Sequence, residues 1–119
     1  MILVDTSVWV DHLREGDAAL RAALLDGQVI THPFVIGELA CGTMRRRDEV
    51  LDLLNALPAA RIATHAEALA LIDGHRLSGS GIGWIDVHLL ASARLSHVRL
   101  WTRDHRLDAA ARQLHVEYA

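Results

Sequence analysis

The sequence contains no lysine, and all 12 of its basic residues are arginines. A phosphate-binding loop of the G-x-x-x-x-G-K type is therefore excluded. Catalysis through a lysine Schiff base is excluded for the same reason. The absence of one residue type thus removes two large groups of enzymes from consideration.

Cysteine is nearly absent as well, because Cys41 is the single example. One cysteine can form neither an internal disulfide nor a multi-cysteine zinc site. Its neighbours Leu39, Ala40 and Gly42 predict a small buried thiol. No adjacent cation or base indicates a reactive thiolate.

Long apolar runs are also missing, and the N-terminus has neither the basic nor the apolar region of a signal peptide. These absences predict a soluble, cytoplasmic protein without membrane association. With 119 residues, 51% of them apolar, the chain can close one hydrophobic core. We therefore expect a single domain over residues 1–119.

Short apolar runs alternate with helical patterns along the chain, and one Gly/Ser-rich stretch, SGSGIG at 78–83, predicts a loop inside the domain. The expected strands cover residues 2–4, 28–32, 60–63, 98–102 and 115–118. The expected helices cover residues 6–13, 17–27, 33–43, 45–57, 65–77, 84–95 and 104–114. This alternation predicts an α/β fold in which helices flank a small central parallel sheet. In the fourth helix, Val50, Leu53, Leu54 and Leu57 form the expected core face.

Four acidic residues stand at positions that a ligand site can use. Asp5 and Asp104 each follow an expected strand, Asp86 lies in the first turn of its helix, and Glu38 lies within an apolar helix. Neighbouring parallel strands end at the same edge of a sheet, where ligands of open α/β folds gather. Carboxylates brought together there need protons or cations, and an all-oxygen ligand set favours Mg²⁺ or Mn²⁺.

Each acid also has a purely local explanation. Asp5 and Asp104 are good helix N-caps, and Asp86 interacts favourably with the dipole of its helix. Glu38 fits an exposed position at the edge of an apolar face. The residues alone leave these alternatives open.

The order of four segments along the chain carries a family resemblance: ILVDTSVWVDHL, VIGELACG, GIGWIDVHLLASA and LWTRDHRLDAAA. Together they resemble the PIN-domain ribonucleases, in particular the VapC toxins of bacterial type II toxin–antitoxin pairs. The resemblance covers essentially the whole chain. It implies a PIN-like α/β/α sandwich.

The resemblance also implies the site and the chemistry. Asp5, Glu38, Asp86 and Asp104 would form the catalytic cluster and bind one or two Mg²⁺ or Mn²⁺ ions. The substrate would be a specific RNA, such as a tRNA or an rRNA loop, cut by metal-activated water to leave a 5′-phosphate and a 3′-hydroxyl. Partners would be a second copy of the chain, joined through helices of the first half, and a VapB-type antitoxin whose C-terminal segment covers the site. The assembly with antitoxin would be a heterotetramer or larger.

Several further residues are candidates for supporting roles. Thr6, Ser7 and Thr102 flank the acids and can hydrogen-bond a water or a phosphate, although helix capping also explains them. Asp108 lies one helical turn after Asp104 and can share its face. Among family members an aromatic residue often stands three places after the last acid, whereas this chain has Leu107.

The arginines are the expected contacts to RNA. Setting aside the four site carboxylates turns the net charge of −3 into +1. Arg45, Arg46 and Arg47 then predict a phosphate-contacting rim close to Glu38. The alternative is a solvated helix start in which Asp48 and Glu49 are their ion-pair partners.

Two other functions compete with the nuclease. In a phosphatase or receiver domain Asp5 would accept a phosphoryl group, but the haloacid-dehalogenase pattern needs Asp where this chain has Ser7, and the lysine that both types use is missing. In a non-enzymatic alternative, the chain is the antitoxin-bound part of a DNA-binding repressor complex and has little activity of its own.

Overall fold

A computed structural model describes all residues from Met1 to Ala119. Its sheet has three short parallel strands, β1 (Ile2–Val4), β2 (Val29–Ile30) and β3 (Arg99–Trp101), in the order β2-β1-β3. Leu3 of β1 pairs with Ile30 on one side and Leu100 on the other. This central position explains why β1 is entirely apolar and buried. Asp5 and Thr102, which directly follow β1 and β3, therefore lie at the same edge of the sheet.

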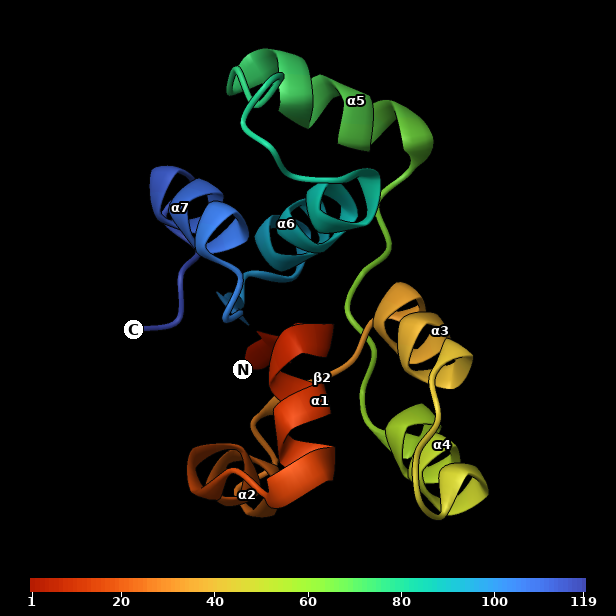
Figure 1. The fold of residues 1–119 in the computed structure, drawn as a ribbon. Helices are drawn as coiled ribbons and strands as arrows, with labels where there is room; N and C mark the ends of the chain where they lie inside the picture. The colour runs from red at the N-terminus through yellow and green to blue at the C-terminus, as the bar shows by residue number, and fades with distance from the viewer.

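Seven helices surround the sheet: α1 (Thr6–Glu15), α2 (Ala18–Leu25), α3 (Pro33–Cys41), α4 (Arg47–Ala56), α5 (His65–Gly74), α6 (Trp84–Ser96) and α7 (His105–Gln113). Figure 1 shows α5, α6 and α7 gathered in one half of the molecule and α1 to α4 in the other. Within these halves α5 and α7 pack against α6, while α3 packs against α1 and α4. The predicted sandwich, a small parallel sheet flanked by helices, is confirmed. No helix is both long enough and apolar enough to span a bilayer.

Helix α6 has the longest buried stretch of the seven helices and fixes one part of the candidate site. Every residue from Val87 to Ala93 is buried, whereas Asp86 just before them is half-buried. Leu89 and Leu90 belong to a single core cluster that also includes Leu3 and Leu100 of the sheet. The start of α6, with Asp86 in its first turn, is thus held by the packing of the core.

Two expected strands are wrong. The segment 60–63 forms no strand, and its neighbourhood contributes one parallel bridge, Thr31 to Ala59. The N–H of Arg61 is directed to Ser96 Oγ at 2.9 Å, so it is not available to a ladder. The segment 115–118 likewise makes one bridge, Leu100 to Glu117. His115 has φ 59°, which interrupts extended backbone where that strand would begin.

Two predictions of burial are also wrong. Leu53 was expected in the core, yet its side chain is 69% exposed while the adjacent Leu54 is buried. Helix α4 packs against α3 and no other element to a comparable extent, so its buried face is narrow. Cys41, the last residue of α3, is exposed. Its apolar sequence neighbours did not indicate that the end of the helix faces solvent.

Candidate active site

Asp5 combines the two roles that the sequence left as alternatives. It is buried, follows β1 and is the N-cap of α1. Its Oδ2 accepts hydrogen bonds from Ser7 Oγ at 2.7 Å and from Thr102 Oγ1 at 2.8 Å. Its Oδ1 accepts no hydrogen bond from the protein. Two hydroxyl groups therefore fix the carboxylate while one oxygen is left for a ligand.

Asp104 has the same division between its two oxygens. Oδ1 caps α7 by accepting from the backbone N–H groups of Arg106 at 2.9 Å and Leu107 at 3.0 Å, and Oδ2 accepts none. The N–H of Asp104 donates to Thr102 Oγ1 at 3.1 Å. Thr102 is therefore hydrogen-bonded to Asp5 by its hydroxyl proton and to Asp104 by its hydroxyl oxygen.

Asp86 shows that the acids share one region. Its Oδ2 accepts from the N–H of Gly83 at 3.1 Å, and its Oδ1 is free. Burial raises the pKa of this carboxyl, and the charges of Asp5, Asp104 and Glu38 raise it further against the lowering effect of the Gly83 bond. Three acids from distant parts of the chain thus repel the charged form of the fourth.

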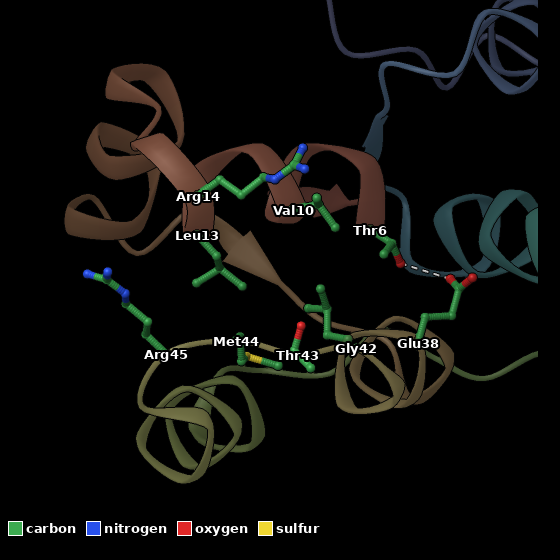
Figure 2. Close-up of a pocket in the computed structure, with 10 residues that line it drawn as sticks. Thr6, Val10, Leu13, Arg14, Glu38, Gly42, Thr43, Met44 and Arg45 are labelled. Carbon is green, nitrogen blue, oxygen red and sulfur yellow. Dashed lines mark hydrogen bonds between the residues drawn. The ribbon is translucent and has the colours of Figure 1, made fainter.

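Glu38 lies on α3 with an exposed side chain, which agrees with the alternative of an exposed position at the edge of the apolar face. Exposure does not separate it from the other acids, because its charge reaches Asp86. Thr6 Oγ1 donates to Glu38 Oε1 at 2.8 Å and so connects α1 with α3 (Figure 2). Oε2 accepts no hydrogen bond from the protein.

All four carboxylates therefore engage one oxygen in hydrogen bonds within the protein and leave the other without a protein partner. Capping and ligand binding are compatible here, since they occupy different atoms. In the structure as it stands, no three His, Cys, Asp or Glu side chains are gathered at the spacing of a metal site. The donor set nevertheless fits a hard divalent cation, because it consists of mutually repelling carboxylates with unengaged oxygens.

A groove of about 950 Å³ adjoins this region and runs between α1 and the connection from α3 to α4. Figure 2 shows the hydrogen-bonded pair Thr6 and Glu38 at one end and Arg45 near the other. Val10 and Leu13 point into the groove from α1, opposite Met44. Its apolar side chains thus lie between the negative charge of Glu38 at one end and the positive charge of Arg45 near the other, and Arg14 of α1 adds a second positive charge to the lining.

The three arginines at 45–47 differ in which interpretation they fit, a phosphate-contacting rim or a solvated helix start. Arg45 lines the groove. Arg46 lies 4.0 Å from Glu49, and Arg47 lies 4.0 Å from Asp48, which are the ion pairs that the solvated-helix alternative expects. Arg47 also donates to the carbonyl oxygen of Ala40 at 2.8 Å.

Asp108 has an ion-pair partner of its own on α7. Its Oδ2 accepts from Arg112 Nε at 2.9 Å, within one turn of α7. Leu107, three places after Asp104, is fully buried. At this position the chain therefore supplies core packing.

Sequence reasoning missed an ion-pair cluster beside the site. The guanidinium of Arg103 contacts the carboxylates of Asp11 and Asp17, and its backbone N–H donates to Ser7 Oγ at 3.0 Å. The one available signal was that Arg103 stands between Thr102 and Asp104. No spacing rule pairs residues 86 and 92 positions apart.

Residues 2–113 match the PIN domain family. The chain belongs to this family, the class that its parallel sheet and strand-terminal acids define. Over an alignment of 120 residues it is 50% identical to Ribonuclease VapC32 of Mycobacterium tuberculosis, in strains H37Rv and CDC 1551. The alignment covers 100% of this chain and 97% of the relative. The chain is thus a VapC-type member of the family.

Solved structures agree on the fold. FitAcB from Neisseria gonorrhoeae has a TM-score of 0.62 at 22% identity, with 94% of each chain covered. PAE2754 from Pyrobaculum aerophilum has a TM-score of 0.61 at 17% identity, with 91% of this chain and 77% of the other covered. At such identities the likeness concerns the arrangement of helices and strands.

Proposed function

We propose that the protein is the toxin of a type II toxin–antitoxin pair and a Mg²⁺- or Mn²⁺-dependent endoribonuclease. The observation that carries this proposal is the set of four carboxylates made up of Asp86 and the three whose charges raise its pKa, each with one unengaged oxygen. Its support from similarity is the 50% identity to a protein named as a ribonuclease.

Asp5, Glu38, Asp86 and Asp104 are the residues that would hold the cation through these oxygens. A bound divalent ion lowers the pKa of a coordinated water and stabilises charge on a reacting phosphate. The chain's own contribution is orientation. Ser7 and Thr102 fix the carboxylate of Asp5 within a buried site, and two backbone N–H groups fix that of Asp104.

The proposed substrate is a specific RNA, with tRNA or rRNA as the expected classes. Arg45 has the best position for a phosphate contact because it lines the groove that leads away from Glu38. Arg46 and Arg47 keep this role in the proposal as weaker contacts, since each faces an acid of α4 at 4.0 Å. Both ion pairs are solvent-exposed, and exposed pairs exchange readily for a phosphate.

The same groove suits a VapB-type antitoxin segment. A peptide with a basic residue toward Glu38, apolar residues over Val10 and Leu13, and an acidic residue toward Arg45 would match its lining. Occupation of the groove would cover Glu38. The antitoxin would then inhibit by competing with RNA for this end of the site.

Self-association is proposed through exposed aromatic surface. Phe34 of α3 and Trp84 of α6 are 37% and 40% exposed and both pack on His88 between them. The resemblance implies a dimer joined through helices of the first half; Phe34 belongs to that half, whereas Trp84 would extend the proposed surface to α6. In this assembly residues 1–119 would form one domain.

The test is calorimetric titration of purified, antitoxin-free protein with Mn²⁺. We expect binding by the parent and by Asp52→Asn, which removes an exposed acid of α4, and loss of binding in Asp5→Asn and Glu38→Gln. The parent, but not Asp5→Asn, should then cleave a species in total RNA. Equal behaviour of parent and site variants would contradict the proposal and favour the repressor-subunit alternative.

A further inference from the structure

The side chain of Arg103 joins three parts of the fold. Arg103 lies in the connection from β3 to α7, and its guanidinium contacts Asp11 of α1 and Asp17, the N-cap of α2. The bonds to Asp11 and then Asp17 raise the pKa of Arg103. The backbone bond from Leu20, followed by the bond from Arg103, lowers the pKa of Asp17. Arg103 and Asp17 are therefore both charged at neutral pH.

The backbone around Arg103 is part of the network that holds Asp5. Its N–H donates to Ser7 Oγ at 3.0 Å, and Ser7 Oγ donates to Asp5 Oδ2 at 2.7 Å. On the preceding residue, Thr102 Oγ1 donates to the same Oδ2 at 2.8 Å. Displacement of this one connection would thus disturb both hydroxyl groups that orient Asp5.

The same connection also carries Asp104. The N–H of Asp104 donates to Thr102 Oγ1, so Asp5 and Asp104 meet at one threonine. Residues 102–104 belong to neither a helix nor a strand. Their position depends on these hydrogen bonds and on whatever holds the side chain of Arg103.

We propose that Arg103, clamped by Asp11 and Asp17, is a positioning residue that holds segment 102–104 so that Asp5 and Asp104 can bind a divalent cation together. The inference rests on the proposed function. Arg103 itself touches neither cation nor substrate in this arrangement. It acts through Ser7, Thr102 and the backbone of Asp104.

The sign of one effect distinguishes positioning from simple electrostatics. Arg103 is a cation next to Asp104 in the chain, so its removal reduces repulsion of a metal ion and, by charge alone, tightens Mn²⁺ binding. Removal of a positioning residue weakens binding instead. Groups that orient metal ligands typically contribute about tenfold or more to affinity.

The experiment measures the Kd of Mn²⁺ by calorimetry, together with the Tm of the metal-free protein. We expect Arg103→Gln to weaken binding by about tenfold. Arg103→Lys should recover part of the affinity, since an ammonium can engage one acid at a time. Arg112→Gln is the matched control, because it breaks an exposed Arg–Asp pair on α7, with Asp108, and should bind Mn²⁺ as the parent does.

A second variant keeps the test decisive if Arg103→Gln folds poorly. Asp17→Asn retains Oδ1, the acceptor that caps α2. It removes the negative charge that Arg103 contacts through Oδ2. Combined with Asp11→Asn it should also weaken Mn²⁺ binding, and because the loss of two negative charges has this sign by itself, Arg103→Gln is then added in the same background. Charge alone would restore part of the affinity, whereas a positioning role leaves the affinity low. The inference is overturned if the Kd is unchanged or tighter in Arg103→Gln, if only the Tm falls, or if Arg112→Gln loses as much affinity. Failure of the parent to bind Mn²⁺ would instead overturn the proposed function.

Discussion

His32 caps α3 from inside the core. Its ring is fully buried, its Nδ1 accepts the N–H of Phe34 at 3.0 Å, and its Nε2 has no hydrogen-bond partner. The proton of the neutral ring is therefore on Nε2. A second proton would turn Nδ1 from an acceptor into a donor facing another donor. Burial, and to a smaller extent the charge of His88, lowers the pKa of His32 to about 4.

We predict that stability falls as pH drops from about 6.5 toward about 4, because in this range the unfolded chain binds a proton at residue 32 that the folded chain does not. The loss should reach about 2 kcal/mol at pH 5 relative to pH 7.5. Urea unfolding at both pH values measures it. In His32→Asn, which keeps a capping acceptor, this part of the pH dependence should vanish; a parent equally stable at both pH values would contradict the prediction.

Asp86 has the opposite linkage. The fold raises the pKa of Asp86, so the protonated carboxyl contributes to the free energy of unfolding. This contribution is fully present below the ordinary pKa of 3.8 and is lost as pH rises through the pKa of the folded state. We predict that Asp86→Asn, which keeps an acceptor for Gly83, raises the Tm of the metal-free protein by a few degrees at pH 7. The difference should close as pH approaches 3.8. An equal or lower Tm for the variant at pH 7 would show that the charged carboxyl is not destabilising.

The acidic residues of the site could be predicted from the sequence. Which oxygen of each carboxylate accepts a hydrogen bond, and which is left for a ligand, could not. Asp5 and Asp104 were visible because each follows an expected strand, and their capping potential was visible because aspartate is a favoured N-cap. Whether a cap excludes a ligand depends on which oxygen accepts the hydrogen bond. That division between Oδ1 and Oδ2 is a property of three-dimensional geometry.

At the scale of the element, the Gly/Ser loop between α5 and α6 is constrained at Gly81. Its φ is +88°, and a Cβ added there would lie 2.8 Å from Cδ and 2.9 Å from Nη1 of Arg106. The loop leads directly into Gly83, the N-cap of α6. Gly81 thus allows the start of α7 to pack against the approach to Asp86.

We predict that Gly81→Ala destabilises the protein more than Gly79→Ala. Both glycines have positive φ, which costs a side chain about 1 kcal/mol, but a Cβ at Gly79 would meet nothing within 4 Å. Thermal unfolding compares the two. Arg106→Ala combined with Gly81→Ala should return the loss to that of Gly79→Ala. Equal losses in the two single variants would mean that Arg106 moves aside at no cost.

Elements with strong local signals could be predicted, and those that depend on one distant partner could not. Asp5, Thr64 and Asp104 cap their helices as their residue types indicate. The segment around Ala59 and the C-terminal segment around Glu117 each pair at one residue only. A four-residue apolar pattern does not reveal whether its N–H groups meet a strand or, as for Arg61, a serine side chain.

At the scale of the whole molecule, a cation shared by Asp5, Glu38, Asp86 and Asp104 would connect β1, α3, α6 and α7. We predict that Mn²⁺ stabilises the fold as a whole, by about 2.7 kcal/mol at a concentration one hundred times its Kd. Differential scanning calorimetry with and without Mn²⁺ measures the shift in Tm. Asp5→Asn should show no shift, and Asp52→Asn should show that of the parent. A shift of equal size in Asp5→Asn would place the bound ion elsewhere.

The bond from Thr102 to Asp5 spans 97 positions of the chain. A ribosome makes Asp5 almost at once, but the partner that orients it only near the end of translation. The N-terminal part emerges and begins to fold first. Until β3 reaches its place beside β1, a growing chain has acids without the geometry that unites them. Synthesis itself therefore leaves an interval in which the first acids of the chain exist without their final arrangement.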